Sequence, residues 1–201
     1  MTAAPPRVVL ASKSTARQAL LSGAGVPFEA VSAAVDEEAV KRELAPQALS
    51  PLAMAQALAA AKAVETSKGC DGLVIGADQT LDFDGELVGK ARNLTEARQR
   101  LRSFRGRPHQ LHSAVAVAAE GHLVWSNVQS ATLSVRDFSD RFLEQYLDRN
   151  WKRMMDSVGC YQLEGEGVQL FEAIDGDYFT ILGLPLPPLL AFLREQGVLE
   201  T

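Results

Sequence analysis

The sequence is poor in the features that mark secreted and membrane proteins. Its two cysteines, Cys70 and Cys160, have no paired spacing, which argues against a disulfide-stapled scaffold and favours a reduced, cytoplasmic setting. No stretch approaches the ~18 uninterrupted apolar residues that a membrane span requires. The apolar run that starts at Val8 is too short for a signal peptide. We therefore expect a cytoplasmic protein that has no membrane partner.

Positive charge is also in deficit. Lysine and arginine total 20, aspartate and glutamate total 25, and the formal net charge is -5. Proteins that bind DNA or RNA usually present a basic face, so this balance argues against a nucleic-acid partner. It does not exclude a pocket for a small anion, in which a few cations would be concentrated.

The composition is otherwise that of an ordinary globular protein. The chain has 201 residues, of which 47% are hydrophobic and 22% are charged, and this excludes a disordered or collagen-like chain. The length is sufficient to bury one sizeable core. We expect a single domain over residues 1–201, with two lobes around a cleft.

Predicted strands and helices alternate along the chain, which indicates the α/β class with antiparallel hairpins mixed in. Strands are expected at residues 7–11, 28–32, 72–77, 110–119, 122–127 and then on to 135, 168–174 and 178–182. Helices are expected at residues 15–22, from 36 onward, and at 51–67, 95–104, 139–150 and 186–196. Tight turns are expected at Asp84-Gly85 and Glu120-Gly121.

The segment from Ser12 to Arg17 has the pattern of an anion-binding helix start. It follows a predicted strand, and it combines the hydroxyl groups of Ser12 and Ser14 with the free amides of a helix N-terminus, which attract phosphate. Arg17 lies about one turn inside the helix, so its guanidinium can fold back to the same anion. The alternative is an ordinary capped helix with a surface arginine.

Asp78 follows a predicted buried strand, beside Gly76 and Ala77. A carboxylate at a strand end suits a general base or a magnesium ligand, although a turn-capping aspartate is the alternative. The nearby residues 85–91 approach a Walker A loop. They have three residues between the glycines instead of four, and Ala91 stands where a serine or threonine should hold magnesium. We therefore reject a P-loop.

The remaining polar candidates are interpreted as structural. His109 and His112 are three residues apart on a predicted strand, so their side chains point to opposite faces and cannot chelate one metal. His122 stands alone near a turn. Cys160 is expected to be a small buried packing residue, and residues 164–167 are expected to form a plain turn instead of a flexible ligand loop.

Taken in order, these and further segments resemble the Maf family, nucleoside triphosphate pyrophosphatases once described as septum-formation inhibitors. The matching segments cover nearly the whole chain and are Leu10-Ala11-Ser12-x-Ser14-x-x-Arg17 with Leu20-Leu21, Val35-Asp36-Glu37, Ala61-Lys62-Ala63, Val74-Ile75-Gly76-Ala77-Asp78-Gln79, Gly89-Lys90, residues 97–106 with His109, Val158-Gly159-Cys160-Tyr161-x-x-Glu164-Gly165-x-Gly167, and Gly183-Leu184-Pro185. No single segment is decisive, but the ordered set is highly specific.

The resemblance implies a mixed, twisted α/β sheet with flanking helices and two lobes around a deep cleft, which is a Maf/ITPase-like fold. It implies hydrolysis between the α- and β-phosphates of a nucleoside triphosphate, with a divalent metal, Mg²⁺ or Mn²⁺, as cofactor. It also implies residue roles, which are a general base at Asp78, phosphate-binding cations at Arg17, Lys62 and Lys90, metal ligands at Glu37 and Asp78, and phosphate-loop hydroxyls at Ser12 and Ser14.

Two segments depart from the family pattern. The family commonly has Pro-Arg-Arg after the second serine, but this chain has Thr15-Ala16-Arg17, so one cation or stacking group is missing at Ala16. The family's Lys-Pro is Lys90-Ala91 here, which is expected to loosen the turn that aims Lys90. Both departures concern substrate choice more than the reaction.

Three positions separate the subfamilies, and they are Ala16, Gln79 and Glu164 in this chain. The dTTP/UTP branch usually has Arg, Thr and Gln there, and the 7-methyl-GTP branch usually has Trp, Gln and Glu. This chain matches the second branch at Gln79 and Glu164 and neither branch at Ala16. A carboxylate at Glu164 suits the donor groups of a guanine edge, so we expect a guanine-type or modified purine base. The missing tryptophan removes a stacking platform for a methylated, cationic base.

The sequence thus favours a metal-dependent nucleoside triphosphate pyrophosphatase, because the base, the metal-binding acid and the three cations are all present. The alternatives are a non-enzymatic, nucleotide-binding regulator of cell division, a dTTP/UTP pyrophosphatase, and a house-cleaning enzyme of broad specificity. A nucleoside triphosphate is the expected partner in the first case, and a homodimer stays open as the assembly.

Overall fold

A mixed β-sheet forms the centre of the structure, a computed structural model that describes residues 5–200. Its strands are β1 (Val8–Ala11), β2 (Glu29–Val31), β3 (Leu73–Phe83), β4 (Glu86–Val88), β5 (Pro108–Ala119), β6 (His122–Val135) and β7 (Phe171–Asp175). The strand order is β2-β1-β3-β5-β6-β7, and β4 pairs with β3 outside this path. β1 runs parallel to β2 and β3, whereas all other pairs are antiparallel.

The helices cover this sheet and begin at well-defined caps. They are α1 (Thr15–Gly23), α2 (Glu37–Leu44), α3 (Pro51–Ser67), α4 (Leu94–Phe104), α5 (Asp140–Met154), α6 (Tyr178–Ile181) and α7 (Leu186–Glu195), with 3-10 turns η1 (Ala45–Gln47) and η2 (Glu166–Leu170). Ser50 caps α3 by accepting a hydrogen bond from the Ala53 amide, with Pro51 at the first helical position. Within residues 5–200, no helix combines the length and the hydropathy needed to cross a membrane.

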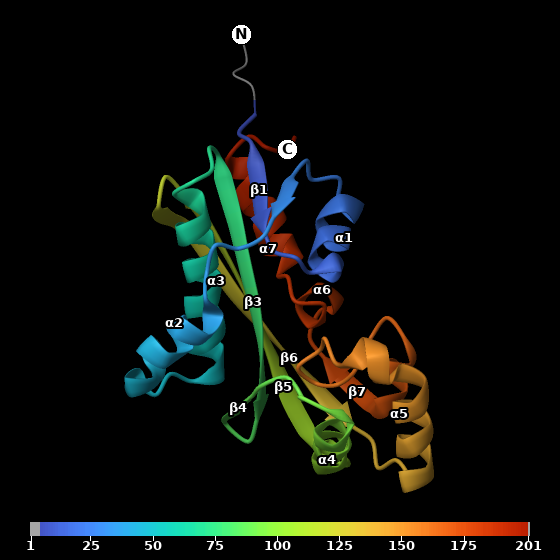
Figure 1. Ribbon diagram of the computed structural model, residues 1–201. Helices are drawn as coiled ribbons and strands as arrows, with labels where there is room; N and C mark the ends of the chain where they lie inside the picture. Colours follow the sequence, from blue (N-terminus) through green and yellow to red (C-terminus); the bar gives the residue numbers. More distant parts are fainter. Residues whose placement is uncertain (1–4, 201) are drawn as a thin grey trace.

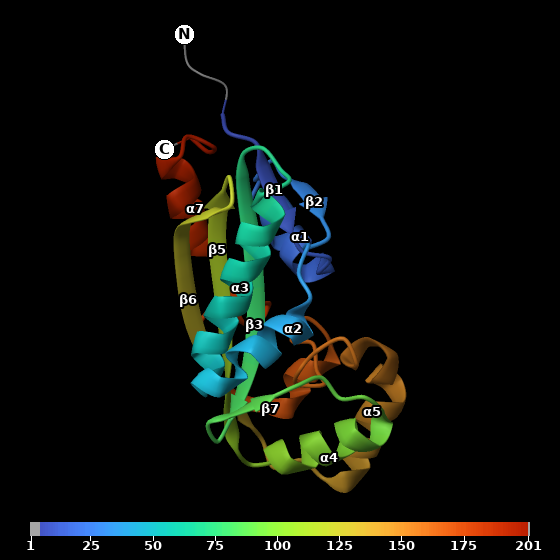
Figure 2. The same cartoon turned by 60° about the vertical axis from the view of Figure 1, so that its left-hand side comes forward.

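The upper part of the sheet is covered on both faces (Figures 1 and 2). Leu21 of α1 and Leu189 of α7 pack with Ile75 and Val117 of the sheet. On the opposite face, α3 and β5 contact each other through alanine side chains. These are Ala55, Ala59 and Ala63 of α3, and Ala114, Ala116 and Ala118 of β5. α3 can therefore approach the sheet closely.

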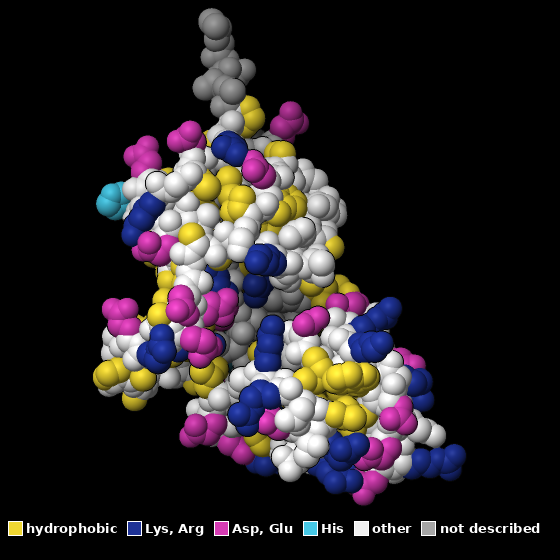
Figure 3. Space-filling model, viewed as in Figure 1, with side chains coloured by type: hydrophobic (Ala, Val, Ile, Leu, Met, Phe, Trp, Pro, Cys, Tyr) yellow, Lys and Arg dark blue, Asp and Glu magenta, His cyan; other side chains and the backbone are white. Residues whose placement is uncertain are grey.

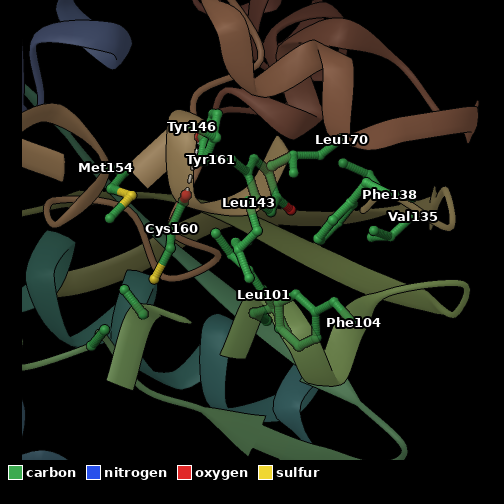
Figure 4. Close-up of a cluster of buried hydrophobic side chains, with 14 of the residues drawn as sticks. Leu101, Phe104, Val135, Phe138, Leu143, Tyr146, Met154, Cys160, Tyr161 and Leu170 are labelled. Atoms are coloured by element: carbon green, nitrogen blue, oxygen red, sulfur yellow. Dashed lines mark hydrogen bonds between the residues drawn. The ribbon is translucent and has the colours of Figure 1, made fainter. Parts of the chain in front are cut away.

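The lower part of the molecule has its own core (Figure 4). α4 and α5 pack against β5 and β6 there, and the largest fully buried side chains of this cluster include Phe104, Phe138 and Tyr146. Among the described residues, this cluster shares no buried member with the clusters of the upper part. The long strands β3, β5 and β6 run through both the upper and the lower part, which are called the two lobes below.

One edge of β3 changes its partner between the lobes. Residues 73–75 pair with β1, and residues 81–83 pair with β4. Between them, residues 76–80 have no strand partner on that edge within residues 5–200. Figure 3 shows the surface hollowed between the two lobes, with acidic and basic side chains at the rim. A sheet edge where neighbouring connections change is a common place for a ligand site.

Most predicted elements are confirmed, and the α/β class with a mixed sheet is confirmed as a whole. The two tight turns are found where expected, with positive φ at Asp84, Gly85, Glu120 and Gly121. The interval 122–135 is one continuous strand, β6, whereas two successive strands were expected.

Three predictions about local structure are wrong. Asp78 does not end its strand, because β3 continues to Phe83. Residues 178–182 were expected to form a strand, but residues Tyr178–Ile181 form a helix capped by the Asp177 carboxylate, which accepts from the Thr180 amide at 2.9 Å. The strand expected at 168–174 begins only at Phe171, because the preceding residues form η2.

Candidate active site

Three charged side chains meet beside the unpaired segment of β3. The Lys62 ammonium lies 2.6 Å from Asp78 Oδ1 and 2.8 Å from Glu37 Oε1. The side chains of Lys62 and Asp78 are 7% and 10% exposed, whereas that of Glu37 is 45% exposed. A buried ammonium thus bridges one buried carboxylate and one that faces solvent.

Alternation along β3 and the close approach of α3 explain why Lys62 reaches Asp78. Side chains on a strand alternate between faces, so Asp78 shares the α3 face with Val74 and Gly76. A Cβ added at Gly76 would lie 2.3 Å from the Ala59 carbonyl oxygen, so only glycine allows α3 to pack this closely. This role of Gly76 was not predicted from the sequence, although a glycine inside a strand can indicate such a close approach.

Glu37 is positioned by the start of α2. Asp36 caps this helix and accepts hydrogen bonds from the amides of Glu38 and Ala39, which places Glu37 at the first helical position. Partial burial raises the pKa of the Glu37 carboxyl, but the hydrogen bond and the charge of Lys62 outweigh this effect, so the pKa lies below its ordinary value. Glu37 is therefore an anion at neutral pH.

Arg17 approaches the same place from α1. Its Nε donates to the Gly183 carbonyl at 2.8 Å, and its Nη1 donates to the Ala77 carbonyl at 3.0 Å. Burial lowers the pKa of the Arg17 guanidinium, while the charges of Asp78 and Glu37 raise it. An arginine remains protonated at any physiological pH, so a fixed positive charge stands next to Asp78. Sequence reasoning missed Gly183 as a partner, since it is 166 residues away.

The predicted phosphate loop forms the start of α1. Ser14 is the N-cap, with its hydroxyl accepting from the Arg17 amide at 3.4 Å. The buried Ser12 accepts from the Ser14 amide at 3.2 Å. The loop leads directly from the end of β1, which is the neighbour of β3 at this edge. A helix N-terminus and two hydroxyls are therefore placed as an anion site requires.

Gln79 points to the opposite face of the sheet from Asp78. Its Nε2 lies 2.9, 3.1 and 2.9 Å from the Ser113 hydroxyl and the carbonyls of Thr180 and Ile181, which share its two hydrogens. The Ser113 hydroxyl also donates to the Thr180 carbonyl, at 2.6 Å. The amide nitrogen of Gln79 thus contacts α6.

The other predicted site residues lie on exposed or peripheral segments. Lys90 is exposed between β4 and α4, and Glu164 is exposed before η2. Within residues 5–200, no hydrogen bond or ion pair joins either of them to Lys62 or Asp78. Ala16 is partly buried in the first turn of α1. Ala91 is 6% exposed in the lower core, so the segment that carries Lys90 is anchored.

The histidines and Cys160 have the structural environments that were predicted. His109 is buried, shares a hydrogen bond of 2.6 Å with the Tyr161 hydroxyl and stacks on Phe104. Burial lowers the pKa of His109 to about 4. His112 instead contacts the Ser130 hydroxyl, through Nδ1 at 2.7 Å. Cys160 is a free, buried cysteine, and burial raises the pKa of its thiol.

Comparison with known proteins places this arrangement in a family. The chain is 57% identical to a nucleoside triphosphate pyrophosphatase of Caulobacter vibrioides over 192 residues, which cover 96% of each protein. It is 48% identical to a 7-methyl-GTP pyrophosphatase of Rhizobium meliloti, over 97% of this chain and 98% of that protein.

A solved structure of a nucleoside-triphosphatase / dITP/XTP pyrophosphatase from Mycobacterium abscessus aligns with 95% of this chain and 94% of its own, at 15% identity and a TM-score of 0.44. Residues 7–196 match the sequence profile described as "Maf-like protein". The chain therefore belongs to the Maf family.

Proposed function

We propose that this protein is a nucleoside triphosphate pyrophosphatase that releases a nucleoside monophosphate and pyrophosphate. The observation that carries the proposal is the cluster of Glu37, Lys62 and Asp78, next to a helix N-terminus that suits phosphate. The family membership and the names of the two relatives support the same activity.

Asp78 is the proposed general base. Its carboxylate accepts a proton from a water molecule, whose oxygen forms a bond to the α-phosphorus. The bond between that phosphorus and the oxygen that bridges to the β-phosphorus breaks, and the bridging oxygen leaves with pyrophosphate. Lys62 holds the carboxylate in place at 2.6 Å, so the base is oriented before the substrate arrives.

The cations neutralise the charge that would otherwise oppose this attack. Lys62 contacts the Asp78 carboxylate, Arg17 contacts the carbonyl of the preceding residue, Ala77, and Lys90 lies on the segment between β4 and α4. The amides at the start of α1 and the hydroxyls of Ser12 and Ser14 receive phosphate oxygens. Such pre-arranged charges stabilise the transition state, in which negative charge moves onto the leaving pyrophosphate.

A divalent cation, Mg²⁺ or Mn²⁺, fits the donors present. Glu37 and Asp78 both contact the ammonium of Lys62, so two carboxylates already face one cation. Residues 5–200 hold no group of three or more potential His, Cys, Asp or Glu ligands. Mg²⁺ is usually held by one or two carboxylates together with water and substrate phosphates. When bound, the metal would offset charge on the triphosphate.

A guanine-type base is the proposed preference. Glu164 offers a carboxylate, which accepts from the ring N–H and the amino group of guanine. Gln79 offers Oε1, a second acceptor, because its nitrogen is engaged by α6 and Ser113. Two acceptors suit the donor groups on the guanine edge, whereas the carbonyls of uracil and thymine are themselves acceptors.

Pyrophosphate release from GTP, 7-methyl-GTP, dTTP and UTP with Mg²⁺ tests the proposal directly. We expect release from the guanine nucleotides at a higher kcat/KM than from the pyrimidines. The Asp78→Asn variant should lose at least ~100-fold in kcat. If the wild-type protein releases no pyrophosphate, or if Asp78→Asn retains full activity, the enzyme assignment fails, and a nucleotide-binding regulator becomes the better description. Equal kcat/KM values for all four would indicate broad specificity.

A further inference from the structure

The side chain of Arg17 joins three segments that are far apart in the sequence. It originates in α1, contacts the Ala77 carbonyl on β3 and contacts the Gly183 carbonyl in the turn that follows α6. The second contact closes a separation of 166 residues. Because Ala77 immediately precedes Asp78, the backbone held by Arg17 is the backbone that carries the proposed base.

The Ala77 contact compensates for a missing strand. On this edge β3 is paired up to residue 75 with β1 and again from residue 81 with β4. The Arg17 guanidinium donates to the Ala77 carbonyl within the intervening segment at 3.0 Å. A charged donor forms a stronger hydrogen bond than a neutral amide, so this edge of the segment is held although no strand among residues 5–200 pairs with it.

The Gly183 contact fixes the guanidinium on its other side. Gly183 has a φ of +94°, a conformation that favours glycine, and a Cβ added there would lie 3.3 Å from Nη2 and 3.4 Å from Nε of Arg17. The guanidinium therefore lies against the Cα of Gly183, with room for no side chain there unless Arg17 moves. Glycine is needed at position 183 because it adopts this positive φ without strain and because it has no Cβ to contact the guanidinium.

The same turn receives further donors from β3. The α6 carbonyls of Thr180 and Ile181 accept hydrogen bonds from Gln79 Nε2. The last carbonyls of a helix lack partners within the helix. Gln79 contacts two of these carbonyls in α6, and Arg17 contacts the Gly183 carbonyl in the turn that follows. This turn is thereby tied to both residues that flank Asp78.

We propose that Arg17 is a positioning residue for the reaction, which fixes the strand of Asp78 through the Ala77 and Gly183 carbonyls, and that Gly183 positions Arg17 in turn. This inference rests on the proposed function and goes beyond the role of Arg17 as a cation for phosphate. If position 17 needed only a positive charge, a lysine would serve equally well. Two carbonyls in different directions require a planar group with several donors.

The test compares kcat and KM for GTP with Mg²⁺ in Arg17→Lys, Arg17→Met, Gly183→Ala and the double variant Arg17→Met/Gly183→Ala. We expect Arg17→Lys and Gly183→Ala each to lose about tenfold or more in kcat, although both keep a positive charge. In the Arg17→Met background, Gly183→Ala should have little further effect, because the contact is already absent. Gly69→Ala is the matched control, since a Cβ there meets nothing within 4 Å.

A chemical rescue experiment covers the case in which Gly183→Ala does not fold. Millimolar guanidinium should restore part of the kcat of Arg17→Ala, whereas methylammonium, which carries the same charge without the planar donors, should not. Equal rescue by both ions, full activity of Arg17→Lys, or additive losses in the double variant would overturn the positioning role. A loss confined to KM would also overturn it.

A measurement of stability tests the contact between Arg17 and Gly183 independently of the proposed function. If the wild-type protein released no pyrophosphate, thermal unfolding of the same four variants would still test the contact between Arg17 and Gly183. We expect Arg17→Met and Gly183→Ala each to lower Tm, by amounts that do not add in the double variant. Additive Tm shifts would show that the two residues act independently, and would overturn the positioning role whatever the activity.

Discussion

The ammonium of Lys62 lies 2.6 Å from the carboxylate of Asp78, and the two side chains are almost completely removed from solvent. The pair connects α3 to the middle of β3. Removing two opposite charges from water has a large desolvation cost, which their attraction offsets only while both partners are present. Each residue is therefore needed to keep the other in place, and Glu37 supplies the second contact of the ammonium at 2.8 Å.

Substitution of Lys62 by methionine is expected to affect both stability and activity. Lys62→Met leaves the buried Asp78 carboxylate without its partner, so the free energy of unfolding should fall by about 3 kcal/mol. The kcat should fall at least ~100-fold, because the base loses its orientation and the site loses a cation. Denaturant unfolding and pyrophosphate release measure the two effects.

A double variant separates the pair from the individual residues. The loss of stability in Lys62→Met/Asp78→Asn should be smaller than the sum of the losses in the two single variants, because no isolated charge remains buried. Lys68→Met is the matched control, because Lys68 forms an exposed pair with Glu65 near the end of the same helix. Its substitution should change stability by less than about 0.5 kcal/mol. Additive losses at Lys62 and Asp78 would contradict the coupling.

Gly76 is expected to tolerate no side chain. In Gly76→Ala the new methyl group would lie 2.3 Å from the Ala59 carbonyl oxygen and 2.5 Å from the Ala63 nitrogen. α3 has to move away from β3, which should lower the free energy of unfolding by about 3 kcal/mol. Lys62 moves with the helix, so kcat should fall as well. The Gly69→Ala control should show neither effect, and an active Gly76→Ala protein of normal stability would exclude this packing role.

The features that could be predicted from the sequence are those that local chemistry determines. The start of α3 follows from Ser50 and Pro51, because a cap and a first-turn proline act within a few residues of the chain. The tight turn at Asp84-Gly85 was found for the same reason. The Ser12–Ser14 loop, with a strand before it and a helix after it, also has a local pattern, which is why its placement was correctly anticipated.

The features that sequence reasoning missed depend on residues that are distant in the chain. An aspartate was expected to end this strand, but β3 continues past Asp78 because it stays paired with β5 as far as Asp82. Lys62 of α3 offsets the charge of the buried carboxylate. Residues 178–182 have the aromatic and β-branched side chains of a strand. They form α6 because Asp177 caps them and because Gln79 and Ser113 bind their carbonyls. The Asp177 cap is local, but the contacts of Lys62, Gln79 and Ser113 join residues that are far apart in the sequence.

Glu37 is expected to be more important for the metal than for the fold. Its carboxylate is partly exposed and faces the same ammonium as Asp78. Glu37→Gln should therefore raise the Mg²⁺ concentration for half-maximal activity at least about tenfold, with little loss of stability. A titration of pyrophosphate release with Mg²⁺ measures this. Glu38→Gln is the control, as the adjacent Glu38 pairs with Lys41 on the surface. An unchanged Mg²⁺ requirement in Glu37→Gln would remove the metal role.

Glu164 is expected to contribute to the choice of base. Replacing its carboxylate with an amide in Glu164→Gln adds a donor, which suits the carbonyls of uracil and thymine. The ratio of kcat/KM for GTP to that for UTP should fall about tenfold. Glu172→Gln, a change of the same chemistry on the exposed residue Glu172 of β7, should leave the ratio unchanged. A ratio that does not move in Glu164→Gln would discard the role.

Because His109 is buried, we expect the protein to lose stability in mild acid. Burial lowers its pKa in the folded protein to about 4, against an ordinary value of 6.5. Above pH 6.5 the imidazole is neutral in both states and contributes no pH dependence. As the pH falls from 6.5 towards 4, the unfolded chain binds a proton that the folded chain does not bind, so unfolding becomes more favourable. The total effect is about 3 kcal/mol, and it is complete below pH 4.

The variant His109→Gln isolates this effect, because it keeps a hydrogen-bonding side chain near Tyr161 and cannot be protonated. The free energies of unfolding of wild type and variant should be measured by denaturant titration at several pH values between 4 and 8. The difference between them should be constant above pH 6.5 and should shift in favour of the variant by about 3 kcal/mol by pH 4. Parallel curves for wild type and His109→Gln would show that the buried imidazole does not destabilise the fold in acid.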